Sequence, residues 1–440
     1  MTPATDEAVR QRYRHTIAVT VAQEALLYDR IARLYRSEAQ PDNPAARLAT
    51  TLRHAVRDVP AYREVAVLEA DFADPYGALA RFPLISKRDL RDRLVDFCSD
   101  SIDPDACRFG TTSGTTGMPL KVIHSLDHIV SEYATALRRN RALGLPERRR
   151  IIEPMKTVPL PWTEYESPAR WHSVVAEFGT GPGGESADVL AQVQRFNPDV
   201  VYGHPSDCVA FAQRLNAGGV AVAPRLVVTY GEYVSDAVRS YLESSFSPAR
   251  VIDFYAMYEF GTIAVRCAEG RYHVEEKVFV EVVSEDGSDI PLGNVGEIVV
   301  TGLTNDVMPL IRYRTGDFGK LVEGICACGA EGRALTELVG RESGVISFDD
   351  GAEVRLSGVT RILRRYPLLR FQIVRDAESS FSVRIQPAAG FEESQLAEMR
   401  DFLTRQLFGR PVALQVVGPA EFIPDDRRKA VDYIDLYAAR

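Results

Sequence analysis

The chain has 440 residues, of which 61 are acidic and 52 basic, so its formal net charge is −9, and 45% of its residues are hydrophobic. These values are typical of a soluble globular protein large enough for two or three domains. The acidic balance argues against a protein that coats DNA or RNA, because phosphate binding needs clustered lysine and arginine. No stretch approaches the ~20 apolar residues of a membrane span, and the first residues lack the pattern of a secretory signal. We therefore expect a cytoplasmic protein.

The first hundred or so residues are predicted to be mostly helical, with a long amphipathic helix over 8–36, a second over 43–57 and a third that begins after Ser86 as its N-cap. From about 125 to 340, helical and β-rich runs alternate, which indicates layered α/β structure. The expected strands are 199–202, 226–230, 250–255, 278–283 and 296–301, and the expected helices are 188–196, 205–215 and 235–246.

After residue 341 the pattern starts again. Strands over 371–374, 381–385 and 412–417 and a helix over 392–407 predict a small α/β unit of the size of a domain. The sequence therefore predicts two α/β domains, 1–340 and 341–440.

A loop rich in glycine, serine and threonine occupies residues 111–121. Its glycines permit unusual backbone angles, and its hydroxyls and backbone N–H groups can surround phosphate oxygens. It is not a Walker A loop, because no Gly-Lys-Ser/Thr follows. A flexible linker is the alternative, but linkers rarely have this density of threonine, so we favour phosphate binding.

Two further stretches carry polar groups suited to a nucleotide. The run from Tyr255 to Gly261 directly follows an expected strand, where α/β sheets bind ligands. Tyr255 offers an aromatic face for a base, and Glu259 offers a carboxylate for Mg²⁺. Asp317 follows a glycine and can accept the two hydroxyl hydrogen bonds of a ribose. Taken singly, each of these side chains is also typical of an ordinary surface or turn position.

In order and spacing, these three motifs resemble those of the adenylate-forming ligases, which include acyl-CoA synthetases, nonribosomal adenylation domains and luciferases. The resemblance is closest to the phenylacetate-CoA ligase-like branch and spans essentially the whole chain. It implies an N-terminal adenylation domain (1–340) that binds ATP and the acid, and a mobile C-terminal domain (341–440). The residues it assigns to the nucleotide are Thr112, Ser113, Gly114, Thr115, Thr116, Gly117, Gly231, Glu232, Tyr255, Ala256, Tyr258, Glu259, Asp317 and Arg341.

The resemblance also implies the chemistry. A carboxylate, aromatic or aryl-alkyl by the resemblance, attacks the α-phosphate of ATP-Mg²⁺ and gives an acyl-AMP, and CoA then displaces AMP. Lys429 is the candidate catalytic lysine, and a solvated basic tail is the alternative for it. Ala256 stands where the family has glycine.

Two other functions stay open. The segment after Arg341 departs from the family pattern, which motivates an ATP-dependent amide ligase with an amine as acceptor. Arg428-Lys429 replaces the usual Gly-Lys, which motivates a catalytically reduced nucleotide-binding homologue. The identity of the acid, the pathway and the oligomeric state are not readable from the sequence.

Half of the six cysteines lie in two short segments, one of which also carries a histidine. Cys267 precedes His273, and Cys326 and Cys328 form a Cys-x-Cys-Gly run. Three cysteines and one histidine make a closed tetrahedral set suited to structural Zn²⁺, and some members of the resembled branch carry a similar pair of segments. We favour zinc over independent thiols. Because four protein ligands leave no coordination position for water, we expect the ion to have a structural role.

The acid pocket is the least readable part. His204 lies at an expected strand end before a helix and faces either the substrate or the helix N-terminus. Trp162 and Tyr165 are candidate pocket walls, with core aromatics as the alternative.

Overall fold

The computed structural model describes residues 3–37, 43–103, 107–111, 120–155, 161–179, 187–341, 345–423 and 432–437. By its contacts the chain divides into two compact units, each described below by itself. Unit 1 comprises Met1–Arg148, Glu166–Ser173 and Phe254–Leu338, and unit 2 comprises Arg149–Tyr165, Val174–Asp253 and Val339–Arg440. Among the described residues, no helix combines the length and the apolar character that crossing a membrane requires.

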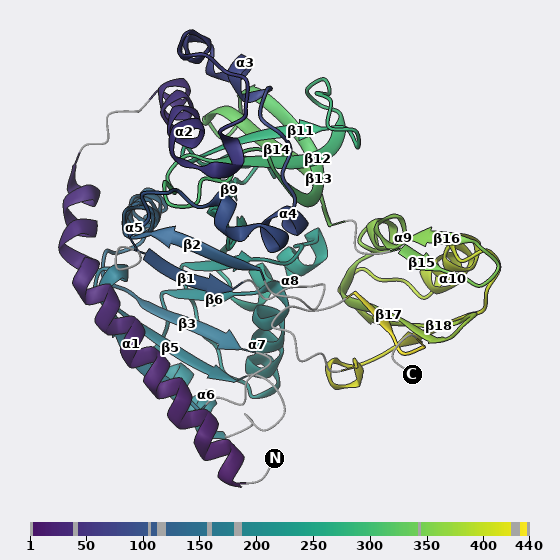
Figure 1. Ribbon diagram of the computed structural model, residues 1–440. Helices are drawn as coiled ribbons and strands as arrows, with labels where there is room; N and C mark the ends of the chain where they lie inside the picture. The colour runs from purple at the N-terminus through teal and green to yellow at the C-terminus, as the bar shows by residue number, and fades with distance from the viewer. Residues whose placement is uncertain are drawn as a thin grey trace. The chain divides into compact units, whose positions relative to one another are not determined.

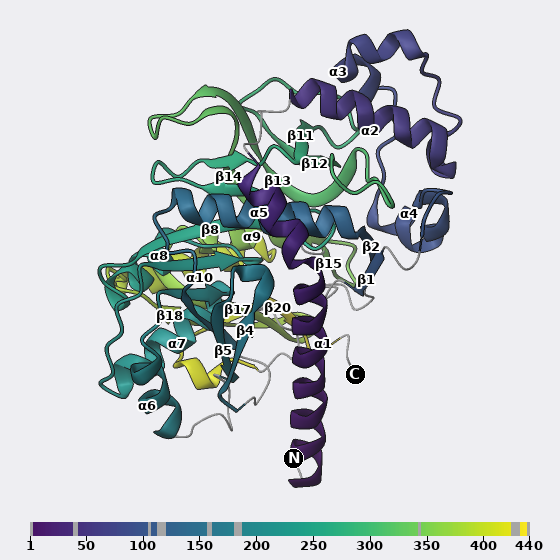
Figure 2. The same cartoon turned by 90° about the vertical axis from the view of Figure 1, so that its left-hand side faces the viewer.

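Unit 1 begins with the predicted helices, and each has a local reason to start where it does. The side chain of Asn43 accepts a hydrogen bond from the N–H of Ala45, and Ser86 and Asp89 cap each other's backbone N–H groups in a capping box. The first helix packs along α5, while α2 and α3 lie side by side (Figures 1 and 2). The helices are α1 (Pro3–Arg36), α2 (Pro44–Asp58), α3 (Pro75–Leu79), α4 (Lys87–Asp92) and α5 (Leu126–Ala142).

The rest of unit 1 is β structure. β1 and β2 form an antiparallel pair, and the other strands lie in the order β11-β12-β13-β14-β10-β9, with the second half of β8 beside β9. The strands are β1 (Cys107–Thr111), β2 (Lys121–Ser125), β8 (Arg250–Met257), β9 (Gly261–Arg266), β10 (Tyr272–Val274), β11 (Val278–Val283), β12 (Val295–Gly302), β13 (Tyr313–Ile325) and β14 (Glu331–Arg341).

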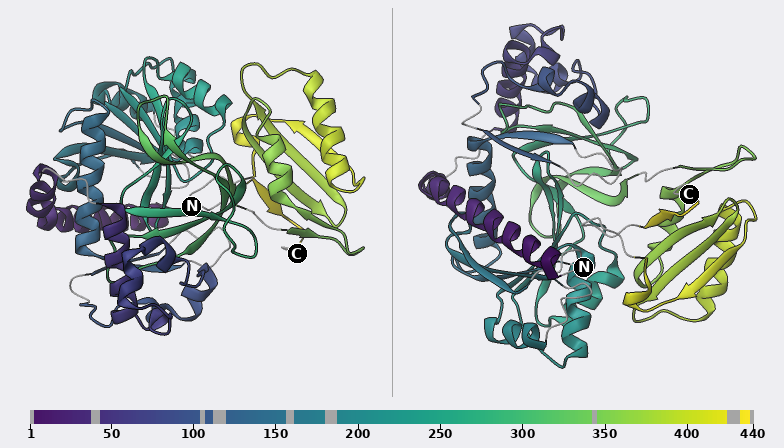
Figure 3. Two further views of the ribbon diagram at one scale, coloured as in Figure 1. Left: turned by 90° about the horizontal axis from the view of Figure 1, so that it is seen from above. Right: turned by 60° about the horizontal axis from the view of Figure 1, so that its bottom comes forward.

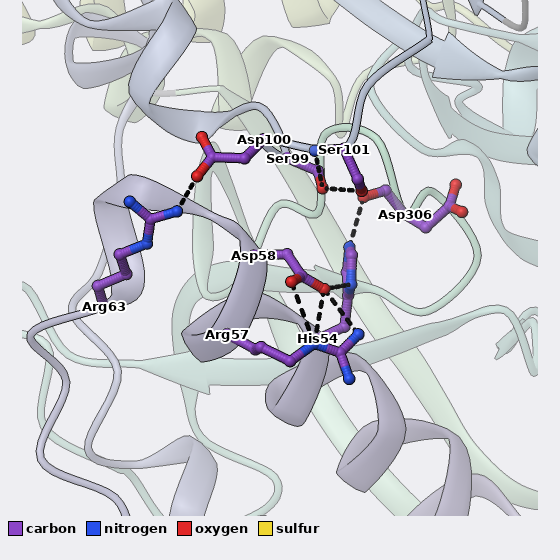
Figure 4. A network of polar contacts seen from close by, with 8 residues as sticks. All are labelled: His54, Arg57, Asp58, Arg63, Ser99, Asp100, Ser101 and Asp306. Atoms are coloured by element: carbon purple, nitrogen blue, oxygen red, sulfur yellow. Dashed lines mark hydrogen bonds and ion pairs between the residues drawn. The ribbon is translucent and has the colours of Figure 1, made fainter.

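A polar network ties α2 to the segment that follows β12 (Figure 4). His54 lies between the carboxylate of Asp58, 2.8 Å from Nδ1, and the carbonyl oxygen of Asp306, 2.7 Å from Nε2. The neighbouring Asn305 accepts a hydrogen bond from the N–H of Ser125 and donates to the carbonyl of Ile123. This segment therefore fixes the second half of β2, the strand that follows the predicted phosphate loop in the chain.

Unit 2 contains a parallel sheet with the expected alternation of strands and helices. β3 pairs in parallel with β5 and β6, and β6 with β7, and the order is β7-β6-β3-β5-β4 with the first half of β8 beside β7. The elements are β3 (Arg150–Met155), β4 (Thr163–Ser167), β5 (Ser173–Gly179), α6 (Ala187–Phe196), β6 (Val200–Gly203), α7 (Pro205–Ala217), β7 (Leu226–Tyr230) and α8 (Asp236–Ser245).

The C-terminal part of unit 2 has a smaller sheet and a core of its own. Its strands lie in the order β19-β18-β17-β20, and α9 and α10 cover one face (Figure 3). The elements are β15 (Val345–Ser347), β16 (Glu353–Arg355), α9 (Leu356–Leu363), β17 (Leu368–Ala377), β18 (Ser380–Pro387), α10 (Ser394–Gln406), β19 (Val412–Val416) and β20 (Tyr433–Asp435).

The expected α/β class is confirmed, and each expected helix and strand occurs with ends that differ by a few residues. One difference matters for function: the strand expected over 250–255 continues to Met257, so Tyr255 and Ala256 lie within β8 and not after it. The domain boundary near residue 340 stays a prediction.

Candidate active site

The predicted phosphate loop and the predicted catalytic lysine, residues 112–117 and Lys429, lie outside the described residues. The structure does describe the two strands that flank the loop. Thr111 at the end of β1 lies opposite Lys121 at the start of β2. The two ends of the loop are therefore held as neighbours. Of Arg341 only the backbone is described, as the last residue of β14.

Two of the predicted nucleotide residues meet in unit 1. The hydroxyl of Tyr255 in β8 donates a hydrogen bond of 2.9 Å to the carboxylate of Asp317 in β13, although the two are 62 residues apart in the chain. Asp317 is buried, and its own N–H donates to the hydroxyl of Thr315. The tyrosine hydroxyl thus orients the carboxylate, and the Thr315 hydroxyl holds the backbone of the same residue.

Glu259 follows in the turn between β8 and β9. It is only 5% exposed, and its Oε1 accepts a hydrogen bond of 3.1 Å from the hydroxyl of the buried Tyr313. A buried carboxylate is costly unless it is hydrogen-bonded or meets a cation. One oxygen of Glu259 is therefore anchored on the core, an arrangement suited to binding a hard cation through the other.

Tyr258 connects this turn to the frame of the phosphate loop. Its ring is 47% exposed and packs on His124 of β2 with ring centroids 5.3 Å apart. Its hydroxyl lies directly over Gly110 of β1, where any Cβ would overlap it. Gly110 is therefore a glycine because the tyrosine needs the space.

Four buried polar residues beside the turn were not predicted. A small pocket is lined by, among others, His128, Glu259 and Lys277. Burial lowers the pKa of His124 to about 4 and that of His128 to about 3, so both are neutral at pH 7. Burial also lowers the pKa of Lys277 and raises that of its partner Glu132. No local signal marks them, because Lys277 ends the charged run Glu275-Glu276-Lys277, which is typical of a surface.

In unit 2, two predicted residues lie at the carboxyl ends of β6 and β7. Glu232 accepts hydrogen bonds of 3.0 Å from both the N–H and the hydroxyl of Ser206, in the first turn of α7. His204 precedes that helix; its Nδ1 lies 3.2 Å from a carboxylate oxygen of Asp207, and its ring packs on Tyr230. Gly231 adopts a φ of 79°, which favours glycine.

Both candidate pocket walls have partners within unit 2. The ring of Trp162 stacks on Phe178 at 5.5 Å and packs against the hydrophobic core of this unit. Tyr165 donates a hydrogen bond of 2.7 Å to Glu177. Trp162 thus has the contacts of a core aromatic, and a substrate role for either residue stays a prediction.

The four predicted metal ligands come together in unit 1. Cys267 follows β9, His273 lies in β10, and Cys326 and Cys328 lie in the turn between β13 and β14. The ligand atoms are all within 4.8 Å of one another, with 3.9 Å between the sulfurs of Cys267 and Cys326 and 3.3 Å from the Cys328 sulfur to His273 Nε2. Tetrahedral zinc places two sulfur ligands ~3.8 Å apart, so the donor set fits zinc in both chemistry and spacing.

The two cysteine turns share one hydrogen-bond pattern. In each, the cysteine N–H donates to the carbonyl four residues on, and the N–H of a glycine three residues on donates back to the cysteine carbonyl. The glycines, Gly270 and Gly329, have φ of 80° and 91°. In the second turn the backbone N–H of Cys328 lowers the pKa of the Cys326 thiol, which favours the thiolate that a metal needs.

No family model matches the sequence. Among curated proteins, phenylacetate-coenzyme A ligase of Escherichia coli (strain K12) is 28% identical over 296 residues, which cover 63% of this chain and 66% of the relative, slightly under two thirds of its length. The enzyme of the same name from Aromatoleum evansii is 24% identical over 384 residues, covering 82% of this chain and 84% of the relative.

Solved structures show the same fold. A 2-hydroxyisobutyryl-CoA ligase bound to an acyl-AMP has a TM-score of 0.68 at 18% identity, covering 90% of this chain and 89% of that one. A benzoate CoA ligase from Burkholderia xenovorans LB400 has a TM-score of 0.50 at 15% identity, covering 75% and 68%. In sequence the chain is thus similar to phenylacetate-coenzyme A ligases, and in fold it is similar to solved CoA ligases.

Proposed function

We propose that this protein activates a carboxylic acid with ATP and Mg²⁺ to an acyl-adenylate and transfers the acyl group to CoA. The observation that carries the proposal is the hydrogen bond between Tyr255 and Asp317, which joins two of the nucleotide motifs beside the turn that holds Glu259. The names of the curated relatives and of the benzoate ligase support an aromatic or aryl-alkyl acid.

The reaction has two balanced steps. A carboxylate oxygen attacks the α-phosphorus of ATP, and pyrophosphate leaves with the electrons of the broken bond. The CoA thiolate then attacks the acyl carbon, and AMP leaves as the phosphate monoester. Catalysis of this kind depends on positioning and on neutralising phosphate charge.

Each predicted residue has one part in this proposal. Tyr255 offers its ring to adenine, Asp317 accepts the ribose hydroxyls, and residues 112–117 hold the phosphates. Mg²⁺ supplies charge neutralisation when bound at Glu259. Gly231 and Glu232 line the adenine in the proposal, His204 faces the acid, and Lys429, carried by a mobile C-terminal domain (341–440), contacts the reacting phosphate.

The Cys267–His273–Cys326–Cys328 set is, in the same proposal, a structural zinc site. Four ligands close a tetrahedral shell and leave no position for water, so the ion holds the two turns together and takes no part in the reaction. The spacing of the donor atoms supports this assignment.

The test is a screen for pyrophosphate release across aromatic, aryl-alkyl and aliphatic acids, with and without CoA. We expect at least one aromatic or aryl-alkyl acid to release pyrophosphate, and CoA to accelerate the release of AMP. If CoA leaves AMP release unchanged while amines accelerate it, the acceptor is an amine. If no acid in the panel releases pyrophosphate, the proposed activity is wrong.

A further inference from the structure

An ion pair between a buried lysine and a partly buried glutamate lies under the turn that carries Glu259. Lys277, the residue before β11, is 5% exposed and pairs with Glu132 of α5, which is 145 positions away in the chain. Its ammonium group also donates a hydrogen bond of 3.0 Å to the carbonyl oxygen of Phe260, the residue directly after Glu259. The pair therefore acts on the backbone of the turn itself.

Gly261, the next residue, shows how closely the pair fits. It adopts a φ of 67°, and a Cβ there would overlap the carboxylate of Glu132 and lie 2.9 Å from the Lys277 ammonium nitrogen. The backbone of residues 260–261 is thus enclosed by the two charged groups. The turn is held at two points, by Tyr313 on the side chain of Glu259 and by Lys277 on the carbonyl oxygen of Phe260.

The surrounding charges balance the pair. Arg139 of α5 forms an ion pair of 2.7 Å with Glu275 and lies over the ring of Phe254. The two cations and the two anions of this group sum to zero, and His128 and His124 nearby are neutral at pH 7. These four charged residues can therefore hold the turn in place without adding net charge next to Glu259.

Stability alone gives a weak reason for such a pair. Removing two charges from water costs several kcal/mol per ion, and apolar residues of similar size often replace a buried ion pair at no loss of stability. Such a pair is better explained by a geometry that it specifies. Here it contacts the backbone carbonyl of Phe260, the residue after the proposed metal-binding Glu259.

We propose that Lys277 and Glu132 are positioning residues, which hold the Glu259 turn so that its carboxylate can bind the metal ion of Mg²⁺·ATP. The inference rests on the proposed function and adds to it two residues outside the sequence motifs. They touch neither nucleotide nor acid in this proposal, and they act through the Phe260 carbonyl.

The test compares three variants. Lys277→Met removes the cation but leaves Glu132 buried and unpaired, so it is expected to lower the melting temperature as well as to disturb the turn. The double variant Lys277→Met/Glu132→Leu removes both charges and is expected to regain most of that stability. Lys320→Met is the matched control, because Lys320 forms an ion pair with Glu337 on β13 and β14, away from the turn.

Three measurements are made on each variant: the melting temperature, the Mg²⁺ concentration that gives half-maximal pyrophosphate release, and the affinity for Mn²⁺·ATP by electron paramagnetic resonance. For the double variant we expect a tenfold or larger rise in the Mg²⁺ requirement and an equal loss of Mn²⁺·ATP affinity, with the KM for the acid within twofold. The control should match the unaltered protein in all three.

The outcomes separate the two proposals. If the double variant regains stability and keeps the Mg²⁺ requirement and Mn²⁺·ATP affinity of the unaltered protein, the pair is merely structural and the inference is wrong. If the unaltered protein releases no pyrophosphate with any acid, the proposed function fails, and the Mn²⁺·ATP affinities still decide the positioning role. An unaltered protein that does not bind Mn²⁺·ATP overturns the positioning role too.

Discussion

Unit 1 holds two candidate cation sites that are built in different ways. The Cys₃His set lies on two similar turns, where short-range hydrogen bonds and a glycine at positive φ orient each cysteine. Glu259 instead is held by a buried tyrosine and by an ion pair whose members lie far apart in the chain. In the first site local turns shape the two cysteine segments, which the sheet then brings together, whereas the second site has no such local turn and depends on the packing of distant elements.

The difference predicts how each site fails. Loss of one ligand from the cysteine set opens the shell of the ion, whereas the turn at Glu259 depends on groups that touch no ligand. Substitutions can therefore abolish the first site outright, and they can weaken the second from a distance.

The largest effect is expected for Cys326→Ser and Cys328→Ser. Metal analysis of the purified unaltered protein should find about one zinc per chain, and each variant should retain almost none, because hydroxyl oxygen is a far poorer zinc ligand than thiolate. Cys208→Ser is the control, since Cys208 is a buried cysteine of unit 2 and is not one of the four candidate ligands. Full zinc content in either variant would contradict the assignment.

Glu259→Gln tests the second site directly. The amide keeps an acceptor for Tyr313 but loses the charge, so we expect pyrophosphate release to fall about 100-fold with little change in melting temperature. The rate is measured at saturating acid over a range of Mg²⁺. A rate within threefold of the unaltered protein would show that the carboxylate does not bind the ion.

Gly261→Ala tests the backbone under Glu259. Its Cβ would overlap Glu132 in a left-handed conformation, so we expect a loss of about 3 kcal/mol in the free energy of unfolding. Gly293→Ala is the matched control, because Gly293 has a similar φ of 86° but open space around it, and should lose about 1 kcal/mol. Both losses are measured by denaturant unfolding. If the two variants lose the same free energy of unfolding, the side chains of the ion pair can move aside for the Cβ at no cost.

The smallest effect concerns pH. The folded state keeps His128 neutral, with its pKa lowered from 6.5 to about 3, so the unfolded chain binds more protons between these values. Stability is therefore lost as pH falls below 6.5, by roughly 2 kcal/mol at pH 5 from this group. His128→Asn, which keeps a partner for Thr304, should have a flatter pH profile. If the free energy of unfolding of this variant falls with pH as steeply as that of the unaltered protein, other groups cause the pH dependence.

The same contrast explains what could be predicted from the sequence. The candidate zinc ligands could be named from the sequence because three cysteines and a histidine gather in two short segments, and each segment forms the same local turn. In unit 2, β6, β7 and β8 were predicted because each contains a run of apolar residues, whereas β3, β4 and β5 of the same sheet were not predicted. The strand β13 was not, because its buried positions include Thr315, Asp317 and Gly319, so the alternation of apolar residues that marks a strand is absent.

The sequence by itself determined the α/β class and many of the helices and strands, and it supplied the candidate nucleotide residues and candidate metal ligands, because each of these depends on short patterns along the chain. Only the tertiary structure decided that Tyr255 meets Asp317, that Gly110 lies under Tyr258, and that Lys277 pairs with Glu132. Those contacts depend on which distant elements pack together. A charged side chain such as Lys277 indicates a specific role only when it is buried, and its burial is a property of the folded chain.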